Sequence, residues 1–195
     1  SLQFLSSVIC KLMLHGFADI HTHRIDSGAD AVISVGPDEI RRPDRFYSVG
    51  VHPWHLAETG LSDGERRALV AAAADSRVVA IGEAGIDLLR GPDPRVQQEA
   101  FMEQAAIAAD AGKALIIHCV RAWHILIRLR AIAVADARRR GIVLPPWIVH
   151  GFRGGPALAR QLLDAGFDLS FGLRYNKESF DITPAERRYR ETDAL

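Results

Sequence analysis

The sequence of 195 residues has little cysteine, no surplus of either charge and no long apolar run. Its two cysteines, Cys10 and Cys119, cannot form a disulfide framework, so a reducing, cytoplasmic setting is expected. Lys and Arg number 24, as do Asp and Glu, and this balance argues against a protein held to nucleic acid by a large basic surface. No apolar stretch approaches the roughly 20 residues that a membrane span needs, so no membrane partner is expected.

The rest of the composition is that of an ordinary globular protein. Hydrophobic residues make up 48% and charged residues 25% of the chain, which excludes disorder and fibrous repeats. The length suits one domain, residues 1–195, and nothing in it indicates an obligate protein partner. Residues 1–16 are expected to be a non-native or poorly ordered leader. A signal peptide is not expected there, since Lys11 interrupts the apolar stretch and no basic region precedes it.

Short apolar runs alternate with segments that carry helix signals. Ser62 and Glu65 have the spacing of a capping box, and Asp93 followed by Pro94 marks a second helix start. The expected helices cover residues 62–76, 93–112, 121–140 and 156–165. The expected strands cover residues 17–21, 31–35, 46–51, 78–82, 114–118, 147–150, 167–171 and, with a weaker pattern, 187–192.

Near-continuous apolar strands that alternate with helices are typical of a parallel sheet covered by helices. Eight candidate strands make an α/β fold of the (β/α)8 TIM barrel type the leading architecture. Only about nine residues separate His21 from the second strand, so the first unit is expected to be trimmed. An open doubly wound sheet is the alternative, although no GxGxxG or Walker motif follows a strand.

Histidines and acidic residues stand at the ends of the predicted strands. The set comprises His21, His23, Glu83, His118, His150 and Asp193. In a barrel these strand ends meet at one mouth, where the active sites of this fold lie. Imidazoles and carboxylates together suit borderline divalent ions such as Zn²⁺ or Mn²⁺, and a bridging Glu83 would hold two ions about 3.5–4 Å apart. The sequence therefore predicts a site for one or two divalent metal ions.

The motifs HTH, GVHPWH, GEAGID, IHCVRA, HGFRGG, SFG and ETD follow one another from about Phe17 to the end of the chain. In this order they resemble the TatD-related hydrolases, which are metal-dependent, deoxyribonuclease-like enzymes. The resemblance implies a TIM barrel that binds divalent metals, with Zn²⁺, Mn²⁺, Mg²⁺ and Ni²⁺ as candidates. It also implies hydrolysis of phosphodiester bonds, with DNA or a smaller phosphoester as the substrate.

The resemblance assigns roles to individual residues. His21 and His23 match the first pair of metal ligands, Glu83 the bridging ligand, and His118 and His150 the later histidine ligands. Asp193 matches the aspartate that binds metal and activates the attacking water, so Glu83 and Asp193 are the expected catalytic residues. His52 matches a histidine near the site, with a structural role in the Pro53 turn as the alternative. From their position just past strand ends, Arg121 and Arg153 are candidates for phosphate contacts.

Two features depart from the family pattern. Relatives continue past the ETD motif with helices, whereas this sequence has two residues after Asp193 and is expected to lack the C-terminal helix. The last strand also carries Arg188 and Arg190, which alternation places on the face opposite Asp193. Burying them there unpaired would be very costly, so either that face is exposed or the C-terminal segment is disordered or incomplete. Two alternatives to a DNase therefore stay open: a C–N or C–O hydrolase of a small metabolite, favoured by the zero net charge, and a non-catalytic metal-binding domain.

Overall fold

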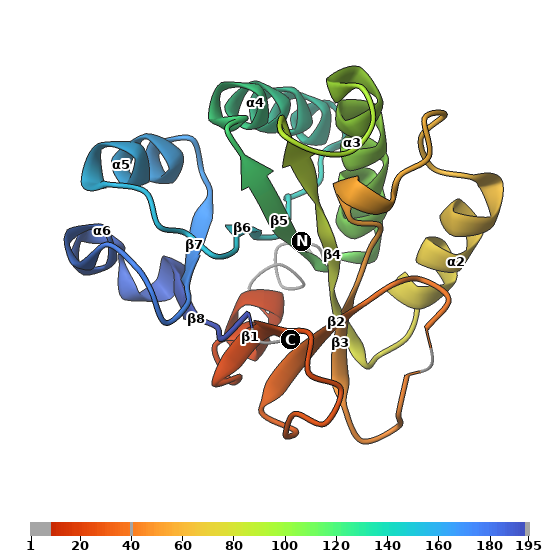
Figure 1. Ribbon diagram of the computed structural model, residues 1–195, viewed down its shortest axis with the longest axis horizontal. Helices are drawn as coiled ribbons and strands as arrows, with labels where there is room; N and C mark the ends of the chain where they lie inside the picture. The colour runs from red at the N-terminus through yellow and green to blue at the C-terminus, as the bar shows by residue number, and fades with distance from the viewer. Residues whose placement is uncertain (1–8, 40, 194–195) are drawn as a thin grey trace.

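The structure is a computed structural model that describes residues 9–39 and 41–193 (Figure 1). Its eight strands form one parallel sheet in which each strand pairs with its neighbours in the chain, in the order β1 to β8. The strands are β1 (Asp19–Thr22), β2 (Ala31–Val35), β3 (Phe46–Val49), β4 (Val78–Asp87), β5 (Ala114–Val120), β6 (Trp147–Val149), β7 (Asp168–Phe171) and β8 (Arg188–Arg190). The predicted (β/α)8 barrel is thus confirmed.

Helices cover the outside of the later strands. They are α2 (Asp63–Ala73), α3 (Pro94–Ala111), α4 (Trp123–Arg140), α5 (Pro156–Asp164) and the short α6 (Lys177–Ile182). The capping box at Ser62 and the αL cap at Gly112 are both formed as the sequence predicts. Within the described residues no helix joins β1 to β2, as expected, and none joins β2 to β3 either. The second strand–helix unit therefore lacks its helix as well, whereas the sequence predicted a shortened connection only in the first unit.

The inside of the barrel is filled by apolar side chains from the strands. Ile20, Val32, Ile116, Ile148 and Tyr189 belong to one buried cluster. Residues 9–14 are helical, and Leu14, only 1% exposed, packs into this cluster. This part of the expected leader is therefore packed against the barrel, whereas residues 1–8 lie outside the described residues. No helix in the described part of the chain is long and apolar enough to cross a membrane.

The seam between β1 and β8 is joined by side-chain hydrogen bonds of Asp19 and by a backbone hydrogen bond of Asp193. No strand ladder links these two strands among the described residues. Instead, the Asp19 carboxylate accepts from the Thr192 backbone N–H at 3.1 Å and from the Thr192 hydroxyl at 2.5 Å. The Asp193 N–H donates to the His21 carbonyl at 3.0 Å. These bonds close the barrel and hold Asp193 beside the first strand.

Replacing Asp19 with alanine is expected to lower the free energy of unfolding by about 2–3 kcal/mol, because bonds to a charged group are lost together. The measurement is urea denaturation of the variant and the unaltered protein. Asp26→Ala is the matched control, since Asp26 is exposed and lies only against Arg24. An equal effect of the two substitutions would show that the hydrogen bonds of Asp19 at the seam contribute nothing to the free energy of unfolding.

The outer face of β8 is covered by aromatic side chains of α6 and of the loop before it. The Arg188 guanidinium lies 4.2 Å above the Phe180 ring, and that of Arg190 lies 4.1 Å from Phe180 and 5.0 Å from Tyr175. Both arginines face outward, as predicted, and cation–π contacts there avoid the cost of burying them. α6 was not predicted, because six residues are too few to show a helical period.

Candidate active site at the barrel mouth

The residues of the site come from the C-terminal ends of β1, β4, β5, β6 and β8. Glu83 lies inside β4, which continues to Asp87, beyond the end at Gly82 that we had expected. Two glycines let this strand run close to β5: a Cβ atom on Gly82 or on Gly85 would overlap a carbonyl oxygen of β5. The close approach brings Glu83 next to His118.

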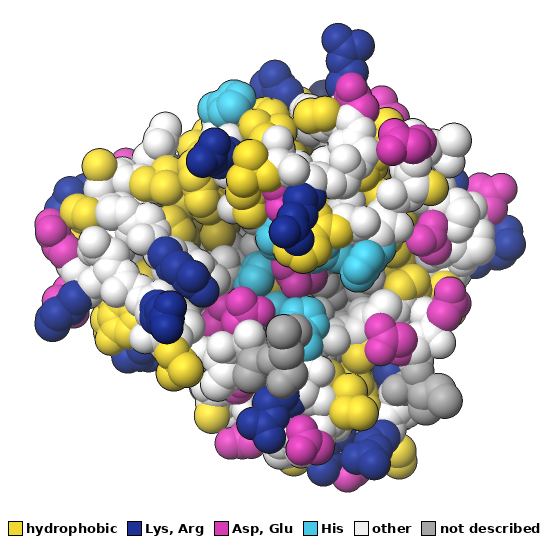
Figure 2. All heavy atoms as spheres, viewed as in Figure 1, with side chains coloured by type: hydrophobic (Ala, Val, Ile, Leu, Met, Phe, Trp, Pro, Cys, Tyr) yellow, Lys and Arg dark blue, Asp and Glu magenta, His cyan; other side chains and the backbone are white. Residues whose placement is uncertain are grey.

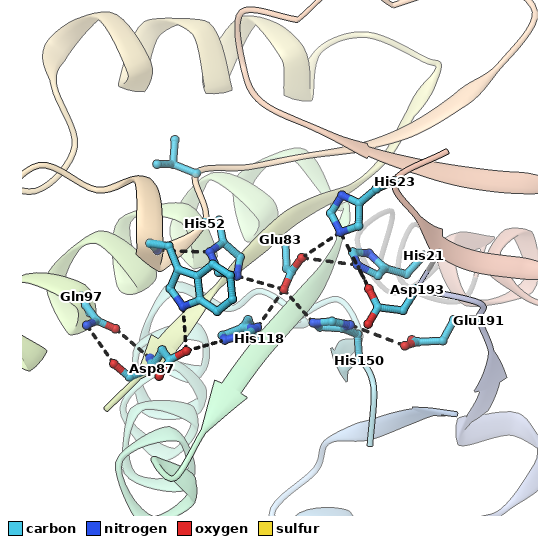
Figure 3. Close-up of polar contacts among 12 residues, drawn as sticks. His21, His23, His52, Glu83, Asp87, Gln97, His118, His150, Glu191 and Asp193 are labelled. Carbon is cyan, nitrogen blue, oxygen red and sulfur yellow. Dashed lines mark hydrogen bonds and ion pairs between the residues drawn. The ribbon is translucent and has the colours of Figure 1, made fainter. Parts of the chain in front are cut away.

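Glu83 occupies the centre of the site, and its two carboxylate oxygens face different histidines (Figure 3). Oε1 lies 2.7 Å from His150 Nε2 and 2.9 Å from His118 Nδ1. Oε2 lies 3.4 Å from His21 Nε2 and 3.6 Å from His23 Nε2. One carboxylate thus connects two groups of imidazoles, which is the arrangement of a bridging ligand.

Asp193 completes the group on the Oε2 side. Its Oδ1 lies 3.6 Å from His21 Nε2 and 3.8 Å from His23 Nε2. The structure thereby brings together all six residues predicted as metal ligands.

The buried carboxylates of the site are held in the ionised form. Burial raises the pKa of Glu83, but His150 and the other imidazoles around it outweigh this and keep the pKa well below its ordinary value. Burial likewise raises the pKa of Asp87 and of Glu191, and the Trp54 N–H and His150, respectively, turn the net shift downward. The site therefore offers several negative oxygens to a cation.

The donor set fits a divalent cation. His21 is fully buried, and its Nε2 has no hydrogen-bond partner among the described residues although it lies between carboxylate oxygens of Glu83 and Asp193. A nitrogen and two oxygens that converge on one point without a hydrogen bond are suited to share an ion. On the other side of Glu83, the nitrogens of His118 and His150 converge on Oε1. Mixed nitrogen and oxygen ligands of this kind suit Zn²⁺ or Mn²⁺.

Two further carboxylates lie against the ring nitrogens of His118 and His150 that do not face Glu83. Asp87 Oδ2 lies 3.2 Å from His118 Nε2 and accepts from the Trp54 indole N–H at 2.7 Å. Glu191 Oε1 lies 3.5 Å from His150 Nδ1 and accepts from the Gly151 N–H at 2.7 Å. Carboxylates in such positions fix the ring orientation of metal-binding histidines. Neither Asp87 nor Glu191 is among the site residues predicted above; for Glu191, alternation with the inward-facing Tyr189 is a signal that could have indicated it.

Replacing Asp87 with asparagine is expected to weaken binding of Zn²⁺ or Mn²⁺ by about 10–100-fold, the usual effect of losing a carboxylate that orients a ligand histidine. The carboxylate meets the Trp54 N–H and His118 Nε2 at Oδ2 and accepts from the Leu89 N–H at Oδ1, so the N–H₂ of an amide must face a donor on one of the two sides. Isothermal titration with the metal measures the change. Asp164→Asn, at an exposed position of α5, is the control and should bind metal as the unaltered protein does.

The three predicted substrate-binding residues occupy different positions. His52 Nε2 lies 3.2 Å from Glu83 Oε1, and its Nδ1 accepts from the Trp54 backbone N–H, so His52 both contacts the cluster and caps the Pro53 turn. Arg153 is exposed and lines a small cleft beside Asp193. Arg121 is exposed and lines neither this cleft nor the main cavity.

The cluster lies at the bottom of an open cavity of about 540 Å³, visible as the hollow that holds the histidine and acidic side chains in Figure 2. The walls include Ser34 in β2, Gly36 just after it, and Trp54 in the turn after β3. A cavity of this size accepts a nucleotide or a small metabolite.

Residues 38–194 match the family model of the TatD related DNases. The chain belongs to the TatD-related family. It is 34% identical over 163 residues to an uncharacterized metal-dependent hydrolase TatD of Mycobacterium tuberculosis, and the match covers 76% of this chain and 58% of the relative. It is 32% identical over 174 residues to the 3'-5' ssDNA/RNA exonuclease TatD of Erwinia billingiae, covering 79% of this chain and 59% of that relative.

Solved structures of the TatD family have the same fold. The TatD homolog YjjV of Escherichia coli superposes with a TM-score of 0.69 at 22% identity, over 95% of this chain and 80% of that one. A TatD family hydrolase of Entamoeba histolytica gives a TM-score of 0.67 at 19% identity, over 91% of this chain and 73% of that one. The chain thus spans less than two thirds of the length of the two curated relatives. It covers a larger share, 80% and 73%, of the two solved structures.

Proposed function

We propose that the chain is a divalent-metal-dependent phosphodiesterase that hydrolyses DNA with an activated water molecule. The observation that carries this proposal is the position of Glu83, whose Oε2 faces His21 and His23 while its Oε1 faces His52, His118 and His150. A site for two ions is suited to in-line displacement at phosphorus. Membership of the TatD-related family and the name of the Erwinia billingiae exonuclease support the same assignment.

A bound metal would lower the pKa of a coordinated water molecule and neutralise charge on the phosphoryl oxygens. The protein's own residues would do the rest. Asp193 is partly exposed and lies at the edge of the cavity, where its carboxylate can orient the attacking water and accept its proton. Asp87 and Glu191 hold the rings of His118 and His150 in place. The cavity is open, so a strand end or a loop can reach the cluster.

Fluorescently labelled single-stranded and double-stranded DNA test the proposal. Hydrolysis should occur with added Zn²⁺ or Mn²⁺, stop in chelator and return when the metal is restored. Failure to cleave either form of DNA, in a protein that binds metal, contradicts the proposal. Hydrolysis of a C–N bond, for example in a cyclic amide, by the same metal-loaded sample would instead support the alternative of a small-metabolite hydrolase.

A further inference from the structure

A second, smaller cleft lies beside the cluster at the C-terminal ends of β6, β7 and β8. Its volume is about 220 Å³, and Arg153 after β6 and Arg174 after β7 both line it. Asp193 lines this cleft and the main cavity, whereas Glu83 lines only the main cavity of the two. The cleft therefore adjoins the metal cluster across Asp193 and is not centred over it.

The two arginines leave positive charge free in this cleft. Both are exposed, and within the described part of the chain neither guanidinium has an ion pair or a hydrogen bond. The carboxylates in the lining are partly engaged: Glu191 Oε1 accepts from the Gly151 N–H and Asp193 Oδ1 lies against His21 Nε2, whereas Glu191 Oε2 is buried without a hydrogen-bond partner among the described residues. Lys and Arg side chains also gather on the β7 and β8 side of the hollow in Figure 2.

Two guanidinium groups on separate loops suit a phosphate, because each planar fork can bind two of its oxygens. The loops after the last strands of (β/α)8 barrels frequently hold phosphate groups. An anion between Arg153 and Arg174 would lie beyond Asp193, outside the group of ligands around Glu83. It would therefore be a phosphate other than the one that is cleaved.

The geometry points to a subsite in this cleft for the phosphate next to the scissile one, so that the preferred substrate is a strand that continues past the cleaved bond. This inference rests on the proposed phosphodiesterase function. A chain without net charge can bind a polyanion in this way, because the positive charge is local. The source of the phosphate is a nucleic-acid strand; a single small phosphoester would leave the cleft empty.

Fluorescence anisotropy of a labelled short oligodeoxythymidylate measures the binding, on the full chain in chelator so that no hydrolysis occurs. Arg153→Gln and Arg174→Gln should each weaken binding by about 5–20-fold and lower the slope of log affinity against log salt by about 0.7, the value for one phosphate contact on a single strand. Arg138→Gln, at an exposed position in the last turn of α4, should leave both unchanged. Absence of binding by the unaltered chain, or equal effects of all three substitutions, overturns the proposal.

A second measurement separates the neighbouring phosphate from the scissile one. With metal bound, Arg153→Gln and Arg174→Gln should leave hydrolysis of bis(p-nitrophenyl) phosphate, which has one phosphate, within about twofold of the unaltered rate. The same two substitutions should no longer weaken oligonucleotide binding when a neutral methylphosphonate replaces the phosphodiester linkage next to the scissile one. Equal losses on both substrates would place the arginines on the scissile phosphate and overturn the subsite. If no DNA is hydrolysed but binding responds as expected, the proposed function fails, and what remains is a phosphate-binding site at the two arginines without a scissile neighbour.

Discussion

Replacing Glu83 with glutamine is expected to lower the rate of metal-dependent hydrolysis on the order of 10⁴-fold or more. When several residues act as one catalytic unit, the loss of one of them removes nearly all of the activity. Glu83 is the only residue among the described ones whose two oxygens face both groups of histidines. An amide offers one oxygen and places its N–H₂ against the other group. One substitution therefore disturbs the contacts of Glu83 to both groups of histidines.

Two measurements check this result. Metal content of the purified variant, determined by elemental analysis, should fall together with the rate of DNA hydrolysis. Glu58→Gln, an exposed glutamate without a partner among the described residues, is the matched control and should keep both. A variant that keeps its full metal content and loses less than about tenfold in rate would show that Glu83 is not the bridging ligand.

The sequence predicted the strands and the ligand set for the same reason. Each ligand except Asp193 follows or ends a short apolar run, and parallel strands bring their C-terminal ends to one mouth. The length of β4 was not predictable in this way, because the two glycines beside Glu83 weaken a strand pattern. Their purpose is visible only in three dimensions, where the backbone of β5 leaves no room for a Cβ atom at Gly82 or Gly85.

Other parts of the molecule depend on contacts that a sequence pattern does not record. Asp19 closes the seam through Thr192, 173 residues further along the chain, and nothing near Asp19 in the sequence indicates that partner. The pairing of Asp87 with His118 likewise depends on the register of β4 against β5. Local patterns predict elements, whereas these long-range partners follow from how the elements are paired.

Asp193→Asn is the second substitution with a large expected effect, a loss of about 10²–10⁴-fold in kcat with a smaller change in metal affinity. The carboxylate is the partly exposed acid of the cluster and the one that lies on the border of both cavities. An amide cannot accept the proton of the attacking water, while its remaining oxygen can still face His21 and His23.

Asparagine is also the substitution that leaves the backbone least disturbed. Asp193 has a φ of +49°, in the left-handed region that asparagine tolerates better than most residues, and its N–H bond to the His21 carbonyl does not involve the side chain. Steady-state kinetics on labelled DNA, with metal titration and thermal unfolding of the same samples, measures the effect. Asp164→Asn serves as the control. A kcat within about twofold of the unaltered value, about 0.4 kcal/mol of transition-state stabilisation, would remove Asp193 from the proton-transfer role and leave it only as a ligand.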